Sequence, residues 1–378
     1  MSHANFLVVG AGIVGLAHAL AVAKRGFKVV VFDRSPRAVG ASIRNFGMVW
    51  PIGQPLGTLT DRALLSRQIW GEVASEAGFH LEEAGSLHLA YRADEWAVLQ
   101  EFFETRNDHD AIRLLSPAEA IEKSPAVVTE GLIGALWSAT EAIVDPREAI
   151  WTLPDYLSEK YGVTFKFGTA VTNISGNKLT TAAGEHWQGD RILVCSGADF
   201  ETLYPHHFAE SGITKVKLQM LRTVPQPDRW RMGAALCGGL TLTHYGAFAH
   251  CATLSALKER IAAETPHFPK WGIHVMMSQN GSGELIIGDS HEYGLNPSPF
   301  DKAEINQYVL DYLRGFARVP ALEIAETWHG IYAKLLNQTE LILHPEEPVT
   351  IVNALGGAGM TLSFGLAEQT ISTEISGV

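Results

Sequence analysis

Cysteine is scarce in this sequence. Only three occur in 378 residues, at positions 195, 237 and 251, and their spacing fits neither a disulfide framework nor a metal site. So few cysteines, without a framework, are typical of a reducing compartment. We therefore expect a cytoplasmic protein that holds no metal.

Basic residues are also few. The chain has 29 lysines and arginines against 41 aspartates and glutamates, so 29 − 41 gives a net charge of −12 with neutral histidines. Proteins that bind nucleic acid usually present a basic face, and this balance argues against that class. It leaves room for a few cations inside a pocket for an anionic small molecule.

Long hydrophobic runs are lacking as well. The most apolar stretch, residues 7–23, is interrupted by His18, has no basic segment before it and is shorter than a membrane span. Lipidation motifs and low-complexity segments are not found either. We expect a soluble protein with no membrane partner.

Apolar residues and glycine are what the chain has in quantity. Hydrophobic residues make up 46% and charged residues 19%, which is enough apolar material for a folded core. The length exceeds that of a typical domain of about 100–150 residues, so we expect two domains. The 36 glycines exceed the roughly 26 that average usage gives, and they gather at turns.

The first forty residues carry a dinucleotide-binding pattern. A buried strand at 6–9 precedes Gly10, Gly12 and Gly15, and a helix and a second strand lead to Asp33. In such a βαβ unit the glycines permit a tight turn, close approach of a pyrophosphate and close helix packing. The pyrophosphate lies at the helix N-terminus, and the acidic residue binds a ribose hydroxyl. The pattern fits NAD and FAD alike and disfavours NADP, whose extra phosphate Asp33 would repel.

Turn and capping signals divide the rest of the chain. Residues 40–57 are loop-like, and Ser116 and Asp145 each precede a proline in a helix-start pattern. Near the end, a strand leads into the glycine turn 356–359 and a last helix, which repeats the opening arrangement. The other expected elements are helices at 58–77 (capped by Thr58–Thr60), 93–107 and 301–316, strands at 85–91, 163–171, 178–182, 186–196, 217–224, 341–343 and 349–354, and a hairpin at 274–289.

Together these motifs resemble a known superfamily. The N-terminal glycines with Asp33, the loop 40–47, the helix start at 144–146, the strand ending at Gly197 and the segment 353–363 occur in the order seen in D-amino-acid oxidase, glycine oxidase and sarcosine oxidase. The resemblance spans nearly the whole chain. Segments 42–51 and 217–222 further resemble a subgroup linked to bacterial phosphonate catabolism.

The resemblance implies an α/β chain, α+β overall, with a Rossmann-like FAD-binding domain and a second, antiparallel-sheet substrate domain. The FAD-binding domain would be discontinuous, formed by residues 1–80, 141–215 and 325–378, and the substrate-binding domain would comprise 81–140 and 216–324. The implied FAD contacts are Gly10, Gly12, Ile13, Val14, Gly15, Asp33, Arg34, Ser42, Arg44, Asn45, Val171, Ser196, Gly197, Gly356, Gly357, Ala358, Gly359 and Met360.

Two departures from the superfamily pattern affect the cofactor and the substrate. Sarcosine-oxidase relatives attach FAD through a cysteine shortly before the last two strands, and the segment 328–334 has none. We therefore expect non-covalent FAD, with a bond through His329 as the alternative. Thr361 also stands where sarcosine-type enzymes place a carboxylate-binding lysine, so an ordinary amino-acid carboxylate clamp is in doubt.

The resemblance implies oxidation of a small amine, with hydride transfer to the flavin and hydrolysis of the imine. A phosphonate substrate needs arginine or lysine donors, for which Arg44, Arg222 and Lys334 are candidates. His274 could bind substrate or move protons. Gln219 and Met48 could form cavity walls. Each of these residues also has an ordinary structural interpretation, such as a surface salt bridge, a diphosphate contact or a core histidine.

The leading hypothesis is thus an FAD-dependent oxidase, rather than a dehydrogenase, of 2-aminoethylphosphonate or its N-methyl derivative. Its partners would be the amine and O2 or another electron acceptor, and the oligomeric state is open. One alternative is a glycine, sarcosine or D-amino-acid oxidase with a carboxylate substrate. Others are a flavin-binding protein without turnover and a nicotinamide-only dehydrogenase.

Overall fold

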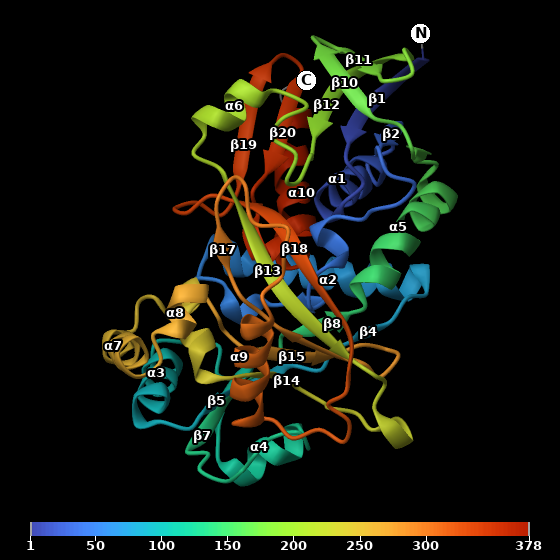
Figure 1. Cartoon of the computed structure of the whole chain (residues 1–378). Coiled ribbons are helices and arrows are strands. Elements are labelled where there is room, and N and C mark those ends of the chain that lie inside the picture. The colour runs from blue at the N-terminus through green and yellow to red at the C-terminus, as the bar shows by residue number, and fades with distance from the viewer. Residues whose placement is uncertain (1, 377–378) are drawn as a thin grey trace.

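A computed structural model describes residues 2–376, whose strands form three sheets (Figure 1). The first has eight strands in the order β10-β11-β12-β1-β2-β9, with β20 beside β12 and β19 beside β20. Its central pairs, β12–β1, β1–β2 and β12–β20, are parallel. The bounds are β1 Ser2–Val9, β2 Val29–Phe32, β9 Thr164–Lys166, β10 Val171–Ser175, β11 Lys178–Thr181, β12 His186–Val194, β19 Leu341–Glu346 and β20 Val349–Asn353.

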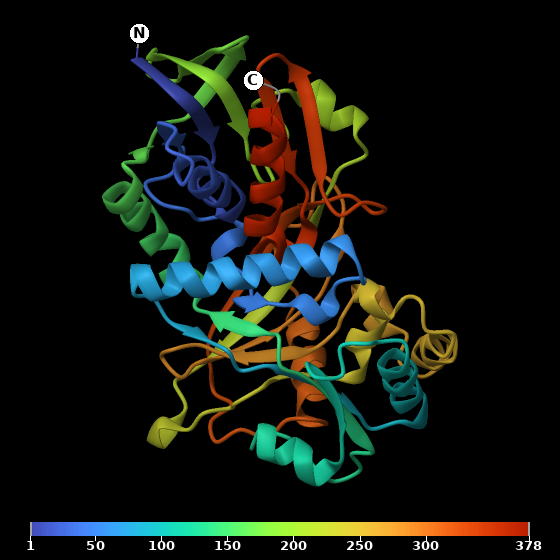
Figure 2. The ribbon, with the colours of Figure 1, turned by 180° about the vertical axis from the view of Figure 1, so that it is seen from behind.

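Helices cover this sheet because its strands are apolar on both faces. Every residue of β2 and β20 is buried, as parallel strands between two layers require. Helix α1 (Ile13–Ala23) packs against α10 (Gly359–Ser376) and α5 (Pro146–Tyr161). Figure 2 shows the long helix α2 (Thr58–Ala77) lying between this sheet and the rest of the molecule.

The second sheet has nine strands in the order β17-β13-β16-β15-β14-β5-β7-β6, with β18 beside β13. All its pairs are antiparallel except β14–β5. A three-stranded sheet, β3-β8-β4, completes the set. The bounds are β3 Met48–Val49, β4 Leu81–Glu82, β5 Ser86–Ala90, β6 Ile112–Leu115, β7 Gly134–Ser138, β8 Ala142–Val144, β13 Thr214–Thr223, β14 Ala235–Cys237, β15 Met276–Gln279, β16 Leu285–Gly288, β17 Glu292–Tyr293 and β18 Ile324–Lys334.

Helices of the lower half surround the second sheet (Figure 1). They bury a separate apolar core, in which Leu89, Phe102 and Met277 are almost fully enclosed. The bounds are α3 Ala93–Glu104, α4 Pro117–Lys123, α7 Leu254–Glu264, α8 His267–Trp271 and α9 Ala303–Arg314, with α6 Pro205–Glu210 on the upper half. Among residues 2–376, no helix combines the length and apolar character needed to cross a membrane.

The mixed α/β class is confirmed, and several local predictions hold. Ser116 Oγ accepts from the Glu119 N–H in a capping box, and Asp145 caps α5. The expected hairpin forms between β15 and β16. The cap predicted at Thr58–Thr60 is wrong, because Gly57 precedes the helix at φ +96° and Thr60 Oγ1 donates instead to the Pro55 carbonyl.

Strand β18 crosses the expected domain boundary. All its residues except Ile324 fall within 325–378, expected in the FAD-binding domain, yet it pairs with β13 along the second sheet from Thr223 to Thr214. Helix α3 also ends at Glu104, earlier than the predicted residue 107. The domain boundaries themselves stay a prediction.

Candidate functional site

The turn after β1 brings backbone close to a large cavity. Gly10 has φ +106°, and a Cβ there would lie 2.3 Å from the Cys195 carbonyl oxygen. A Cβ on Gly12 would lie 3.0 Å from Ser42 Oγ. Gly10 and Gly12 line the cavity with Ile13 and Val14. Only residues without a side chain fit at Gly10, so bare backbone faces the space that the helix N-terminus opens onto.

Gly15 lies behind this turn and allows close packing there, but it does not line the cavity. A Cβ on Gly15 would lie 1.9 Å from the Gly10 carbonyl oxygen and 3.4 Å from Val8 Cγ1. Helix α1 can therefore lie this close to β1 only if residue 15 is glycine. Its contact with a cofactor is indirect, through the position of the helix.

Asp33 lies at the end of β2 and lines the cavity. Its Oδ2 accepts from the Ala11 N–H at 2.9 Å, and its Oδ1 accepts from the Ser35 N–H at 2.8 Å. These bonds fix the carboxylate beside the glycine turn, as a ribose-binding acid requires. Arg34 also lines the cavity, but its side chain is 66% exposed and pairs with Asp199 at 2.8 Å.

The loop after Gly40 is tied to α1 by a serine. Ser42 Oγ accepts from the Ile13 N–H at 2.9 Å. Asn45 Nδ2 donates to the carbonyls of Ala41 and Ser42, and its Oδ1 accepts from the Gly47 N–H. Arg44 donates to the His329 carbonyl at 3.2 Å. Ser42, Arg44 and Asn45 line the cavity, and Asn45 does so while shaping the loop.

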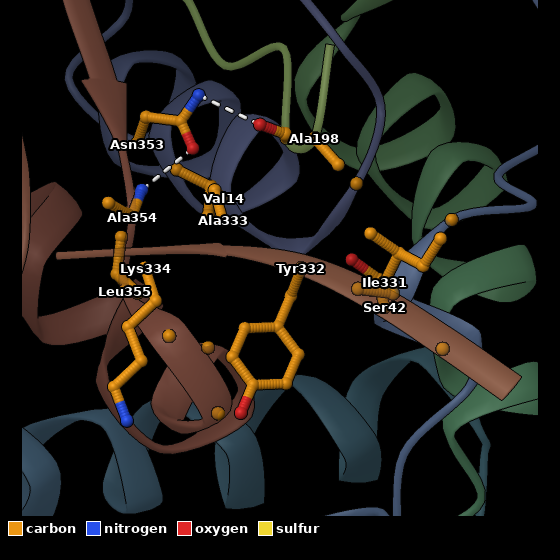
Figure 3. Close-up of a pocket in the computed structure, with 18 of the residues that line it drawn as sticks. Val14, Ser42, Ala198, Ile331, Tyr332, Ala333, Lys334, Asn353, Ala354 and Leu355 are labelled. Atoms are coloured by element: carbon orange, nitrogen blue, oxygen red, sulfur yellow. Dashed lines mark hydrogen bonds between the residues drawn. The ribbon is translucent and has the colours of Figure 1, made fainter. Parts of the chain in front are cut away.

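The ends of β12 and β20 meet on the same side of the cavity. Val171, Ser196 and Gly197 all line it. Asn353, at the end of β20, donates from Nδ2 to the Gly197 carbonyl at 3.0 Å and accepts from the Ala354 N–H at 2.7 Å (Figure 3). This amide holds the closing glycine turn to the strand end of β12.

The second glycine turn brings backbone to the other end of the cavity. Gly356 has φ +58°, and Gly356 to Met360 line the cavity at the N-terminus of α10. A Cβ on Gly357 would lie 3.5 Å from Tyr332 Oη. Backbone N–H groups at such a helix N-terminus favour negative charge. The turn therefore suits a ring system that becomes anionic.

Strand β18 supplies two polar side chains beside this turn. Tyr332 and Lys334 share one face of the strand and extend in the same direction into the cavity (Figure 3). Burial lowers the pKa of Lys334 from its ordinary value, while Asp289 opposes that shift. No salt bridge among residues 2–376 involves Lys334 or Arg44. These two cations are available to an anion.

Three histidines, His244, His274 and His291, form a cluster on the same cavity. The His244 ring lies 3.8 Å from that of His274 and 4.6 Å from that of His291, between ring centres. Burial lowers the pKa of His291 to about 4. His244 is exposed only to the cavity, and desolvation there, with repulsion from the other two histidines, holds its pKa well below the ordinary value. His244 and His291 are therefore neutral at pH 7.

Sequence reasoning had found only His274 of this cluster. His274 and His291 flank the β15–β16 hairpin at nearly equal distances from its turn, and the backbone of Asp289 bonds to that of His274 in both directions. The similar positions of His274 and His291 on the two arms of the hairpin could have indicated that these two side chains lie close together. His244 follows a short helical segment, Gly239–Thr243, and no local pattern connects it to the other two.

Two expected substrate contacts, Arg222 and Gln219, do not line the cavity. On β13 the cavity is lined by Leu218 and Met220, so Gln219 points to the opposite face, where it donates to Lys302 and Asn306. Arg222 lies beyond the end of the cavity and pairs with Glu284 at 2.9 Å and Glu326 at 2.8 Å. Met48 and His274 do line the cavity.

The cavity joins all these parts in one volume of about 1470 Å³. Ligand pockets usually measure about 300–1,000 Å³. The excess leaves room for a dinucleotide cofactor and a small second molecule. The cavity fits FAD through the features that the sequence predicted, which are the two glycine turns, Asp33 and the two helix N-termini.

Comparisons with known proteins agree with this geometry. Residues 5–372 match the family described as FAD dependent oxidoreductase. The chain is 25% identical over 363 residues to glycine oxidase of Geobacillus kaustophilus (strain HTA426), covering 90% of this chain and 84% of the relative. It is 26% identical over 247 residues to D-amino acid dehydrogenase of Helicobacter pylori, covering 51% and 60%.

Solved structures share the whole fold. The chain superposes on L-proline dehydrogenase from P. horikoshii with a TM-score of 0.80 at 22% identity, covering 100% of this chain and 94% of the other. For glycine oxidase from Geobacillus kaustophilus the TM-score is 0.77 at 19% identity, covering 100% and 95%.

Proposed function

Because the chain belongs to the FAD dependent oxidoreductase family, we propose that it oxidises the carbon–nitrogen bond of a small amine that carries an anionic group. The first candidate is an aminophosphonate, 2-aminoethylphosphonate or its N-methyl derivative. When bound, FAD accepts a hydride from the carbon that bears the nitrogen, and hydrolysis of the imine yields an aldehyde and ammonia or an amine.

One observation carries the proposal. Lys334 projects into the cavity beside the second glycine turn and has no carboxylate partner in the described chain. A half-buried ammonium that makes no salt bridge attracts an anion more strongly than an exposed one, because water screens it less. Arg44 lines the same cavity as a second cation that makes no salt bridge among residues 2–376.

The chain's own residues also prepare the reaction. The N–H groups at the start of α10 favour the negative charge that develops on a reduced ring. Apolar side chains such as Met48 and Leu218 also line the cavity and exclude water. An amine held there loses hydration and gives up its proton more readily.

The residues near FAD support non-covalent binding. His329 Nδ1 lies 2.9 Å from Asp301, so its ring is already engaged. Cys195 lines the cavity, but burial raises the pKa of its thiol to about 12, and a protonated thiol is a poor nucleophile. We propose that FAD is held by contacts alone.

A carboxylate substrate is the second candidate, favoured by the similarity to glycine oxidase. The environment of Thr361 argues against a sarcosine-type carboxylate-binding site at this position. Its Oγ1 accepts from the Trp50 N–H at 3.0 Å, and the residue is buried. Its hydroxyl therefore holds the loop after β3, although the residue also lines the cavity.

Turnover under air separates these candidates. The FAD-loaded protein is mixed with 2-aminoethylphosphonate, its N-methyl derivative, glycine, sarcosine or D-alanine, and hydrogen peroxide and aldehyde are measured. We expect the highest kcat/KM for an aminophosphonate, with peroxide formed, since we propose an oxidase. The highest value for a carboxylate would establish the second candidate, and flavin bleaching without peroxide would establish a dehydrogenase. If no amine bleaches the flavin anaerobically, the proposed oxidation is wrong.

A further inference from the structure

We propose that the histidine cluster of His244, His274 and His291 is a binding site for a divalent transition-metal ion such as Zn²⁺. One ring nitrogen from each residue lies within 4.8 Å of the others. Three imidazoles around a tetrahedral Zn²⁺, with nitrogens about 2.0–2.1 Å from the metal, would stand about 3.4 Å apart. Closing to that spacing needs a shift of about 1 Å, within the reach of side-chain rotation. The sequence predicts no metal, because the spacing of its cysteines fits no metal site.

Each of the two buried histidines has, close to its ring, an oxygen atom of the kind that metal ligands use as an outer partner. His274 Nε2 lies 3.0 Å from Asp289 Oδ1, and His291 Nδ1 lies 3.0 Å from the Gly272 carbonyl oxygen. Metal-binding histidines usually donate their second ring N–H to a carboxylate or a backbone carbonyl, which fixes the tautomer and leaves the other nitrogen as a lone pair. His291 fits this arrangement through its hydrogen bond to the Gly272 carbonyl. His274 lies within ion-pair distance of Asp289 but makes no hydrogen bond to it, so its ring must turn slightly to complete the same arrangement.

The remaining ring nitrogen of His274 is left without a partner. His274 is 3% exposed, and its Nδ1 makes no hydrogen bond. A buried polar atom in this condition costs free energy unless something binds it. A metal ion in the cluster would accept its lone pair.

Close packing maintains the outer partner of His291. Gly272 has φ +55°, and a Cβ on it would lie 2.7 Å from the His291 Cβ. Any other residue would push the carbonyl at position 272 away from the ring. Glycine here keeps the acceptor within hydrogen-bond distance of His291.

His244 completes the set from the cavity side. Its ring stacks on His274 and makes no side-chain hydrogen bond among residues 2–376, and the side chain is exposed to the cavity. It can therefore turn from the stacked position towards a metal at low cost. The Asp289 carboxylate, 4% exposed, supplies negative charge next to the cluster and offsets the nearby charge of Lys334.

Three histidine ligands leave a fourth position open towards the cavity, the arrangement of catalytic rather than structural zinc sites. If the proposed function holds, an oxygen of the substrate's anionic group would fill that position, with Lys334 as its second contact. This step rests on the proposed function, whereas metal binding does not.

The test is a calorimetric titration of ZnCl2 into the FAD-loaded, untagged protein after chelator treatment, without any substrate. We expect one Zn²⁺ per chain, and at least a 100-fold loss of affinity in H274N and H291N. D289N should weaken binding about 10–100-fold, because it removes only an outer partner. H186N is the matched control, since His186 is an exposed histidine on β12 that bonds to Thr180, and it should bind Zn²⁺ as the unchanged protein does.

H244N decides the matter if the buried variants do not fold. Its side chain is exposed, so FAD absorbance and thermal unfolding should stay unchanged while Zn²⁺ affinity falls at least tenfold. Failure of the unchanged protein to bind Zn²⁺, or equal binding by H244N and the unchanged protein, would overturn the metal site. Zn²⁺ binding in a protein that oxidises no amine would leave the metal site standing and refute only the proposed function.

Discussion

Ser42 Oγ accepts a hydrogen bond from the Ile13 N–H at 2.9 Å, and this bond joins the loop after Gly40 to the first turn of α1. The two residues are the points where loop and helix both line the cofactor cavity. The serine thus holds the loop against the helix, the two walls of the FAD site, whether or not it also contacts the cofactor.

Ser42→Ala should weaken FAD binding. Loss of a hydrogen bond of about 0.5–1.5 kcal/mol predicts a dissociation constant roughly 2–10-fold higher, measured by titrating FAD into the FAD-free protein and following flavin fluorescence. Ser158→Ala is the control, because Ser158 Oγ bonds only within α5, to the Pro154 carbonyl. Equal affinity in both variants would show that the loop is held by other contacts.

Gly15→Ala should destabilise the protein. The added Cβ would lie 1.9 Å from the Gly10 carbonyl oxygen, so α1 must move away from β1 at a cost of about 1–3 kcal/mol. Denaturant unfolding of the FAD-free protein measures the loss. Gly40→Ala is the control, since a Cβ there meets nothing within 4 Å, and its unfolding free energy should change by less than about 0.5 kcal/mol.

Lys334→Met should raise the KM of the anionic substrate. A charge-assisted hydrogen bond of about 1.5–3 kcal/mol predicts an increase of roughly 10–100-fold, with a smaller effect on kcat. Lys215→Met is the control, because Lys215 also lines the cavity but pairs with Glu201 at 2.8 Å. An unchanged KM in the Lys334 variant would remove Lys334 from substrate binding.

Arg222→Met should leave KM unchanged and lower stability instead. Arg222 pairs with Glu284 and Glu326 outside the cavity. Glu326 keeps Arg147 at 3.0 Å, so the loss of Arg222 mainly leaves Glu284 without its cation, at a cost of about 1–3 kcal/mol. Steady-state kinetics measures the KM and denaturant unfolding measures the stability, both on one preparation of the variant. A raised KM without loss of stability would restore the original assignment of Arg222 to the substrate.

His88 should make the protein sensitive to acid. The residue is 1% exposed between Trp50 and Phe248, neither ring nitrogen has a partner, and burial lowers its pKa to about 3. Its pKa in the unfolded chain is about 6.5, so between these values the unfolded state binds a proton that the folded state lacks. Stability therefore falls as pH falls, by about 1.4 kcal/mol per pH unit from this residue.

His88→Leu tests this dependence, since leucine has a similar volume and does not titrate. Denaturant unfolding between pH 6.5 and pH 4.5 should show a slope smaller by one proton than that of the unchanged protein. His186→Asn, on the surface, should leave the slope unchanged. A slope unaffected by the His88 substitution would contradict a neutral buried imidazole.

The features that the sequence predicted well depend on neighbours along the chain. The caps at Ser116 and Asp145 need only the next three residues, and the turn at Gly10 to Gly15 carries its own strand and helix. The family resemblance added expected FAD contacts far apart in the sequence, such as Val171 and Gly356, and both of these residues line the cavity.

The features that were missed depend on where strands lie beside one another. Alternation along β13 assigns a face to each residue, but only the structure shows that the cavity ends before Arg222. The histidine cluster joins a helical segment and both ends of a hairpin. Residues brought together by tertiary packing leave no period in the sequence, so only one of the three was anticipated.

Helix α10 has a consequence for how the protein is made. It packs against α1 and α2 and carries the second glycine turn at its start, although it comes much later in the sequence than either helix. During synthesis the N-terminal unit leaves the ribosome long before its closing helix exists. The cofactor site is therefore complete only after α10 has been synthesised, so FAD can reach all its contacts only from that point on.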